Sequence, residues 1–351
     1  MARRPTTYVD WEFAKTTAAR LVNPGPDVTE QEARQVVEDI RRSARRAVDP
    51  VAETSRLHAP GTAPAPLVVD RPTWVSVNAD SMATMFEPIA RKLSAASPAP
   101  PPALAQMIGG KVTGAEAGAL FAFLSSRVLG QYDLAPGGTP KLLLVAPNLV
   151  QAERELEVDP TDFRAWVCMH EETHRVQFTA VPWLRDHLIE RTQALAVDMV
   201  PDPTALKDRL AALARNVPGA LGGDGQGLAD VFATPEQKRR MAEITAVMSL
   251  LEGHANVVMD EVGPAHIPSV ATIRARFDER RKGAGTLDRF LRRLMGLEAK
   301  MRQYRDGATF VRAVQDTVGI DGFNAVWTSP ETLPRPAGIT DPQRWVARVH
   351  G

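Results

Sequence analysis

One short motif constrains this 351-residue chain more than any other feature: His170-Glu171-Glu172-Thr173-His174, which has the form H-E-x-x-H. On a helix, residues four apart lie nearly above one another, offset by about 40°. Both imidazoles can therefore reach one metal ion. Glu171 is turned by about 100° from His170, beside the metal and within reach of its water. The motif predicts a helix, a bound zinc ion and a general base for hydrolysis.

The residues around the motif predict a helix over 160–178. Asp159 followed by Pro160 is typical of an N-cap and a first helical position. Apolar and motif residues then share one stripe at helical spacing: Phe163, Trp166, His170, His174 and Phe178. Burying two histidines there costs free energy unless a partner satisfies them. A metal ion would do so; the alternative is a helix whose histidines face solvent or make ordinary core hydrogen bonds.

A third protein ligand is expected, since a catalytic zinc usually has three and keeps one position for water. Glu252 is the strongest candidate, because it lies deep in a predicted helix over 235–262, where a buried carboxylate needs a cation. His254 is turned by about 200° from Glu252 on the same helix, so both cannot easily reach one ion. We prefer Glu252 as ligand. His254 would then contact a ligand, donate to the reacting carbonyl, or be a core histidine bonded to a backbone carbonyl.

Stretches around these residues resemble one known family. The segments 170–178, 251–255 and 259–260 are similar to an actinobacterial family of zincin-like metallopeptidases, whose members are labelled as hydrolases or as associated with biosynthesis of a deazaflavin cofactor. Further similar segments extend over nearly the whole chain: 9–11, 70–72, 78–81, 268–270, 278–281, 300–304 and 323–327. The resemblance implies a gluzincin-like site in which His170, His174 and Glu252 hold one zinc ion.

The motif helix departs from the broader zincin pattern at two positions. The residues inside the motif and directly after it are usually uncharged, whereas this chain has Glu172 and Arg175 there. Both lie away from the ligand stripe, so we expect them to be solvated or to pair with other groups. The departure weakens assignment to the well-studied peptidase clans but does not weaken metal binding.

The motif and the resemblance together predict a zinc-dependent hydrolase, in the first place a peptidase, acting on a peptide or a small amide. Glu171 would take a proton from the activated water and pass it to the leaving group. Tyr304 is a candidate donor to the developing oxyanion, and Gly253 permits close approach of a neighbouring helix. The alternative function is a zinc-binding scaffold or degenerate peptidase that interacts with a partner without turnover.

Composition excludes several other classes of function. The formal net charge is zero, so nothing attracts the chain as a whole to nucleic acid or to an anionic membrane. A single cysteine excludes a disulfide framework. We see no secretory signal and no apolar run of about 18 residues. These features predict a cytoplasmic protein without nucleic-acid or membrane partners, and they do not indicate its oligomeric state.

The periodicity predicts a mainly α-helical fold with a small β-sheet around a zincin-like core. Helices are expected near 11–22, 29–57, 79–95, 113–130, 148–157, 160–178, 182–198, 203–215, 235–262, 270–282, 286–305 and 308–318. Extended segments are expected at 67–69, 74–77 and 141–145, and loops at 59–66, 94–102 and 219–227. By analogy with zincins, residues 142–145 are the best candidate for an edge strand beside the motif helix, but we prefer the interpretation of a buried strand without function.

The domain organisation is expected to be one zincin-like metallopeptidase unit over residues 1–351. Within it we expect an N-terminal helical and sheet subdomain over 1–147 and a metal-site helical part over 148–328. The Pro-rich tail over 329–351 is expected to wrap the surface.

Overall fold

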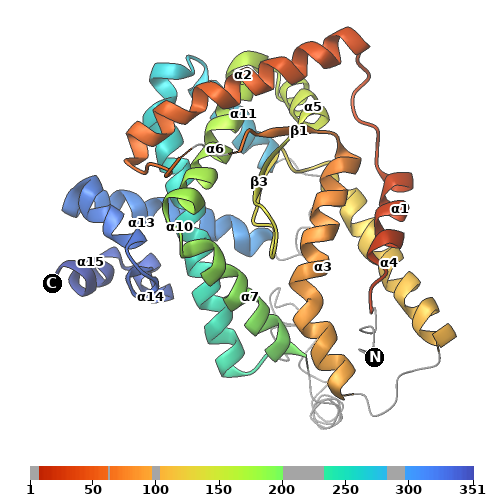
Figure 1. The fold of residues 1–351 in the computed structure, drawn as a ribbon. Coiled ribbons are helices and arrows are strands. Elements are labelled where there is room, and N and C mark those ends of the chain that lie inside the picture. The colour runs from red at the N-terminus through yellow and green to blue at the C-terminus, as the bar shows by residue number, and fades with distance from the viewer. Residues whose placement is uncertain (1–7, 62–63, 97–102, 201–232, 283–296) are drawn as a thin grey trace.

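The computed structural model describes residues 8–61, 64–96, 103–200, 233–282 and 297–351, and in them the fold is mainly helical with a small sheet, as predicted (Figure 1). The first helices are α1 (Trp11–Leu21), α2 (Glu30–Ser55), α3 (Arg71–Ala96), α4 (Ala103–Ser125) and α5 (Ala146–Leu156). The central helices are α6 (Pro160–Ala180), α7 (Leu184–Met199), α10 (Pro235–His266) and α11 (Val270–Lys282). The C-terminal elements are α13 (Leu297–Asn324), the 3₁₀ turns η2 (Ala325–Trp327) and η3 (Pro330–Thr332), α14 (Pro336–Thr340) and α15 (Pro342–His350).

The two helices that matter most for the site begin with well-formed caps. At the start of α6, the Asp159 carboxylate accepts a hydrogen bond from the Asp162 amide at 2.9 Å, which confirms the predicted cap. At the start of α10, Thr234 and Gln237 form a reciprocal capping box. Such caps satisfy amides that the first turn leaves unpaired. The start of each helix is thus determined by its own sequence.

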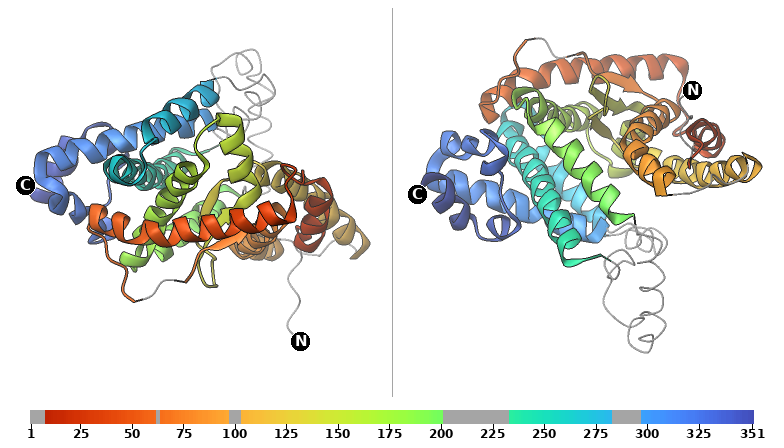
Figure 2. Two further views of the ribbon diagram at one scale, coloured as in Figure 1. Left: turned by 90° about the horizontal axis from the view of Figure 1, so that it is seen from above. Right: turned by 60° about the horizontal axis from the view of Figure 1, so that its bottom comes forward.

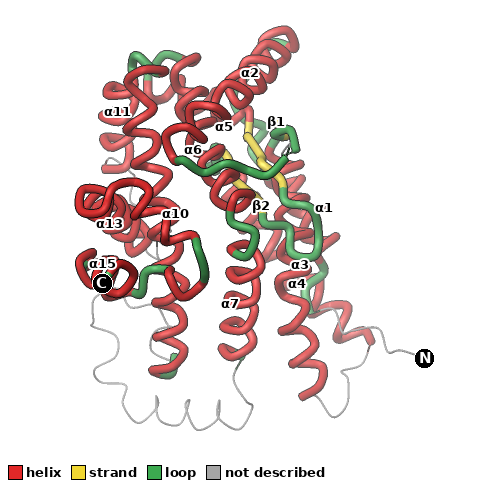
Figure 3. The backbone as a smooth tube through the Cα atoms, turned by 60° about the vertical axis from the view of Figure 1, so that its left-hand side comes forward, coloured by secondary structure: helices red, strands yellow, loops and turns green. Residues whose placement is uncertain are grey.

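The sheet has three strands, and its central strand is buried, as the sequence favoured. β3 (Lys141–Val145) is the central strand; it pairs in parallel with β1 (Leu67–Val69) and antiparallel with β2 (Gly130–Asp133). Residues 142–145 therefore form a buried central strand and not the edge strand that the analogy with zincins suggested; β2 is the edge strand that packs against α6. The physical reason is visible in the sequence: a continuous Leu-Leu-Leu-Val run suits a strand covered on both faces. The short strands lie among the helices in Figure 3.

The expected extended segment over 74–77 is helical instead. α3 begins at Arg71, because the Asp70 carboxylate accepts a hydrogen bond from the Thr73 amide at 2.8 Å. Pro72 follows in the first turn, where its missing N–H costs nothing. This cap outweighs the β-propensity of the alternating segment at 74–77.

The C-terminal tail does not merely wrap the surface, as the sequence suggested. Residues 330–350 form η3, α14 and α15, and Trp345 is only 1% exposed. Its ring meets Phe310 of α13 edge-on, and its indole N–H donates to the Thr332 carbonyl at 2.7 Å. The tail is therefore part of the core, since a buried Trp with a satisfied N–H stabilises it strongly.

Some predicted elements lie outside the described residues: the helix near 203–215, the loop over 219–227 and most of the helix near 286–305. The described helix α13 joins the two helices expected near 286–305 and 308–318, with a kink at Gly319. In the described part of the chain, no helix is long and apolar enough to cross a bilayer. The proposed subdivision at residue 147 stays a prediction.

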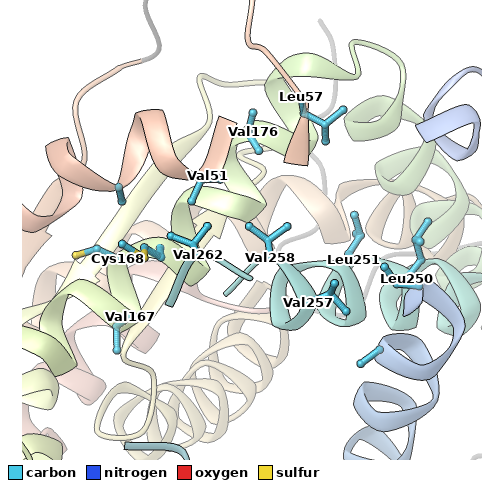
Figure 4. Close-up of a cluster of buried hydrophobic side chains, with 14 of the residues drawn as sticks. Val51, Leu57, Val167, Cys168, Val176, Leu250, Leu251, Val257, Val258 and Val262 are labelled. Atoms are coloured by element: carbon cyan, nitrogen blue, oxygen red, sulfur yellow. The ribbon is translucent and has the colours of Figure 1, made fainter. Parts of the chain in front are cut away.

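The motif helix lies in the middle of the main hydrophobic core. α6 packs against α2 on one side and α10 on another, and α10 in turn packs against α13. Figure 4 shows side chains of these elements meeting, among them Val51 of α2, Cys168 of α6 and Val258 of α10. The C-terminal helices lie at the end of the molecule opposite α1 and α4 (Figure 2). Close packing on several sides fixes the orientation of α6 and α10.

Candidate metal centre

Three side chains from two helices converge on one point. His170 and His174 come from successive turns of α6, and Glu252 comes from α10. One ligand atom from each lies within 4.8 Å of the others. The structure therefore brings Glu252, rather than His254, to the two motif histidines.

The spacing of these three donor atoms suits a tetrahedral metal ion. The Nε2 atoms of His170 and His174 are 3.2 Å apart, and each lies 3.6 Å from Oε2 of Glu252. Around a tetrahedral zinc ion with bonds of about 2.0–2.1 Å, donors lie roughly 3.3–3.4 Å from one another. Two imidazole nitrogens and a carboxylate oxygen are also a donor set that zinc uses in catalytic sites. The residues present fit the ion that the motif predicts.

Gln177 determines which nitrogen of His174 is free to bind a metal, and sequence reasoning missed it. Its amide nitrogen donates to the Leu251 carbonyl at 3.0 Å, which can only accept. Its amide oxygen must then face Nδ1 of His174, 3.0 Å away, so Nδ1 carries the proton. The Nε2 lone pair of His174 is left for a metal, as such hydrogen bonds commonly arrange. The only sequence signal was the position of Gln177, one helical turn beyond His174.

The tautomer of His170 is also favoured by a contact at Nδ1, although the partner there is a weaker acceptor. Its Nδ1 atom lies 3.0 Å from the Met259 sulfur of α10. A thioether is a weak acceptor, so it favours the tautomer with the proton on Nδ1. The Nε2 lone pair of His170 then also faces the centre of the site.

His254 lies behind the site rather than in it. The side chain is completely buried, and its ring packs against Phe323 and Trp327. Nδ1 accepts a hydrogen bond from Gln177 at 2.9 Å, so His254 reaches His174 through that amide. Burial, together with the nearby His174, lowers the pKa of His254 to about 3. It is not among the residues that line the metal cavity, and it contacts the candidate ligand His174 through Gln177.

Glu171 is close to the three donors but makes its own contact with the sheet. A Cβ placed on Gly130 of β2 would lie 2.7 Å from the Glu171 carboxyl carbon, so the carboxyl group packs directly on the bare strand backbone. Burial raises the pKa of Glu171, and the two histidines only partly oppose this. A glycine inside a strand often marks such close approach, which is the signal that could have pointed to β2.

A cavity of about 440 Å³ opens over these groups. It is lined by the three donors, Glu171, residues 130–132 of β2 and several apolar side chains: Val128, Leu134, Phe178, Leu188, Met248 and Leu251. Tyr132 stacks on Phe178 with ring centroids 5.5 Å apart. The site is therefore a concave, largely apolar pocket with a few convergent polar groups, as small-molecule and substrate sites usually are.

Two tyrosines are relevant to the site, and the structure describes the side chain of one of them. The side chain of Tyr304 lies outside the described residues, so its predicted role stays a prediction. Tyr132, which the sequence did not single out, lines the cavity. Burial raises the pKa of Tyr132, so its hydroxyl keeps its proton at neutral pH and can donate a hydrogen bond.

The two unusual charged residues of the motif helix pair with each other. Glu172 and Arg175 are both more than nine-tenths buried, and the guanidinium donates to the carboxylate at 2.6 Å. Arg175 also donates to the Pro64 carbonyl at 3.2 Å. Of the two expectations, solvation is wrong and pairing is correct. The pair lies on a side of α6 away from the ligand stripe, so it leaves the metal site unchanged.

Without metal, the protein is expected to be most stable near pH 6.5. The buried, neutral His254 has a pKa of about 3 in the folded state against 6.5 for an ordinary histidine, so stability falls as the pH drops below 6.5. For His174, burial lowers the pKa but the Glu252 carboxylate outweighs it and raises the pKa to about 9. That stabilisation is complete below pH 6.5 and is lost as the pH rises towards 9. Thermal unfolding with a chelator, scanned over pH, measures this; a melting temperature that climbs from pH 6.5 to 9 would contradict it.

Comparisons with known proteins give a family and a similar structure for this chain. The sequence profile described as zincin-like metallopeptidase matches residues 9–346. The crystal structure of a putative hydrolase with a novel fold from Chloroflexus aurantiacus is similar over 97% of this chain and 99% of that chain, with 29% identity and a TM-score of 0.69. No curated protein matches the chain.

The family and the similar structure both indicate a hydrolase, and the family implies a metal, usually zinc. The actinobacterial origin and the link to deazaflavin biosynthesis stay predictions. The match covers almost the whole sequence, including both helices that carry the three donors. The chain belongs to the zincin-like metallopeptidase family.

Proposed function

We propose that this protein is a zinc-dependent hydrolase that cleaves amide bonds in peptides. One observation carries the proposal: His170, His174 and Glu252 present three donors at the spacing of a tetrahedral zinc site, in a cavity that also contains the Glu171 carboxyl group. A metal site with three protein donors and an acid or base beside it is the arrangement used for metal-assisted hydrolysis.

In this proposal Glu171 moves the proton. Zinc bound at the site would supply a Lewis acid and would make a water molecule a better nucleophile at neutral pH. Glu171 accepts a proton from that water and returns it to the leaving amine. Burial raises the pKa of Glu171, which makes the carboxylate a stronger base than an exposed glutamate and suits it to both steps.

The substrate would lie along β2. This strand forms one wall of the cavity, and the Glu171 carboxyl group packs against it at Gly130. Among the described residues, β2 pairs with β3 alone, so an extended peptide can add to its other side through main-chain hydrogen bonds. Tyr132 follows two residues along the strand, where its hydroxyl can donate to a substrate carbonyl. A peptide, rather than a compact small amide, makes use of such an edge.

Replacement of Glu252 by alanine is expected to abolish tight zinc binding. Removing one of three donors leaves two imidazoles, and two ligands hold zinc several orders of magnitude more weakly. Elemental analysis after zinc loading should give one zinc per chain for the unmodified protein and far less for Glu252→Ala. Glu261→Ala is the matched control, since this residue lies on the same helix but outside the cavity. Equal zinc content in Glu252→Ala and the unmodified protein would exclude Glu252 as a ligand, and no zinc in either would overturn the proposed function.

A further inference from the structure

A second cavity, of about 280 Å³, lies between α7, α10 and the segment 330–335. Its apolar lining residues, called the floor below, are Leu188, Ala194, Ile244, Val247, Pro330, Leu333 and Pro334. Its remaining lining residues are mostly polar or charged and come from all three segments. α7 and α10, which form two of its walls, lie side by side in Figures 1 and 3.

This second cavity adjoins the metal cavity. Leu188 of α7 lines both cavities, and on α10 Val247 lines the second while Met248 lines the first. The two helices are antiparallel, because Gln237 near the start of α10 donates to the carbonyl of Asp198 near the end of α7 at 2.6 Å. The metal cavity and the second cavity therefore follow one another along the same pair of helices.

Some of the charged residues that line the second cavity already form ion pairs within the protein. Arg240 is paired with Glu236 and Asp198, and Glu243 is paired with Arg239. Those charges are satisfied within the protein and contribute little to binding.

Three charged residues of the lining remain. Arg191 and Arg335 are exposed and have no ion-pair partner among the described residues, and Glu331 is the one opposing carboxylate. Arg348 adds further positive charge nearby, since its guanidinium donates to the backbone carbonyls of Glu331 and Leu333. Two free guanidinium groups at the rim of an apolar pocket suit a ligand with an apolar body and a carboxylate end.

The separation from the metal site can be estimated along α10. Ile244, on the floor of the second cavity, lies eight residues before Glu252, which is about 12 Å at 1.5 Å per residue. An extended peptide advances about 3.3 Å per residue. A group bound in the second cavity would thus be about four residues away from an amide bond at the metal.

We propose that the second cavity is a substrate subsite that binds a carboxylate, contributed by an acidic side chain or by the C-terminus of the peptide, about four residues from the bond that is cleaved. Arg191 and Arg335 bind the carboxylate, and the apolar floor accommodates the adjoining chain. The inference rests on the proposed function for the nature of the substrate and adds the feature by which that substrate is selected.

The test uses the zinc-loaded Glu171→Gln protein, which should bind peptides without cleaving them. The ligands are labelled octapeptides of alanine with a central leucine and an amidated C-terminus. Each peptide carries one glutamate, its matched peptide carries glutamine at the same place, and the set covers every position. A second series has a free C-terminal carboxylate at increasing distances from the leucine. We expect glutamate to lower Kd about ten-fold relative to glutamine at one or two adjacent positions, as for a charge-assisted hydrogen bond. The second series shows whether a C-terminus serves as well as a side chain.

Arg191→Gln and Arg335→Gln, each added to this protein, should bring the ratio of the two Kd values close to one and leave the glutamine peptides unaffected. Arg34→Gln, an exposed arginine of α2 far from both cavities, is the control and should preserve the ratio.

The outcomes separate this inference from the proposed function. Peptide binding without a preference for glutamate at any position, or a preference that survives both arginine substitutions, would overturn the subsite alone. A preference that both substitutions remove would support the subsite even if the unmodified protein hydrolysed nothing. Failure of every peptide to bind would overturn both proposals.

Discussion

Replacing Glu171 by glutamine is expected to reduce peptide hydrolysis about a thousand-fold while zinc remains bound. Glutamine has nearly the same shape and can still pack on Gly130, where the Glu171 carboxyl group lies against the strand backbone. It cannot accept the proton of the attacking water, and general base catalysis contributes about 10²–10⁴ to the rate. The loss should appear in kcat rather than in KM, since the exchange leaves the walls of the cavity unchanged.

The measurement compares cleavage of a pool of internally quenched peptides by the zinc-loaded unmodified protein and by Glu171→Gln. Zinc content and thermal unfolding establish that the metal and the fold are retained. Glu190→Gln on α7 is the matched control, because this glutamate is exposed and lies outside the cavity. An unmodified protein that binds zinc but cleaves nothing would favour the alternative of a zinc-binding scaffold. Full activity in Glu171→Gln would exclude Glu171 as the base.

The sequence predicted the local part of the site well. The cap at Asp159, the helix from Pro160 and the positions of the two histidines all follow from residues within a few turns of one another. The structure also places Glu252, rather than His254, beside the two histidines. Helix geometry showed that two residues about 200° apart cannot face one point, and the need of a buried carboxylate for a cation favoured Glu252. Signals of this kind depend on neighbours along the chain.

The rest of the site depends on contacts between distant segments, which one sequence does not specify. β2 contains Gly130, Gln131 and Asp133, and these residues have little β-propensity. The strand forms because it pairs with β3 and because the Gln131 amide bonds to Trp74 and Asn78 of α3. The role of Gln177 likewise requires knowledge of which carbonyl of α10 lies opposite it.

Replacing Gly253 by alanine is expected to destabilise the protein by about 3 kcal/mol and to weaken zinc binding. Gly253 lies where α10 crosses α13, and a Cβ there would overlap the backbone of Gly307 and Ala308. Backbone atoms of a packed helix cannot move aside as a flexible side chain can, so the two helices must separate. Overpacking of this kind costs about 1–3 kcal/mol of stability and occasionally more. Helix propensity favours alanine by only about 1 kcal/mol. Because Glu252 is the adjacent residue, separation of the helices also shifts a donor of the metal site.

Gly109→Ala is the matched control for the destabilisation expected in Gly253→Ala. Gly109 is also helical, in α4, but a Cβ there would meet nothing within 4 Å, so the change should leave stability unaltered or raise it by up to about 1 kcal/mol. Denaturant unfolding gives the two free energies, and competition with a chelator gives zinc affinity. Gly253→Ala should lower both quantities and Gly109→Ala neither. If Gly253→Ala unfolded like Gly109→Ala, the close crossing of α10 and α13 would not be what positions Glu252, and the packing of α10 against its other neighbours, α6, α7 and α2, would do so.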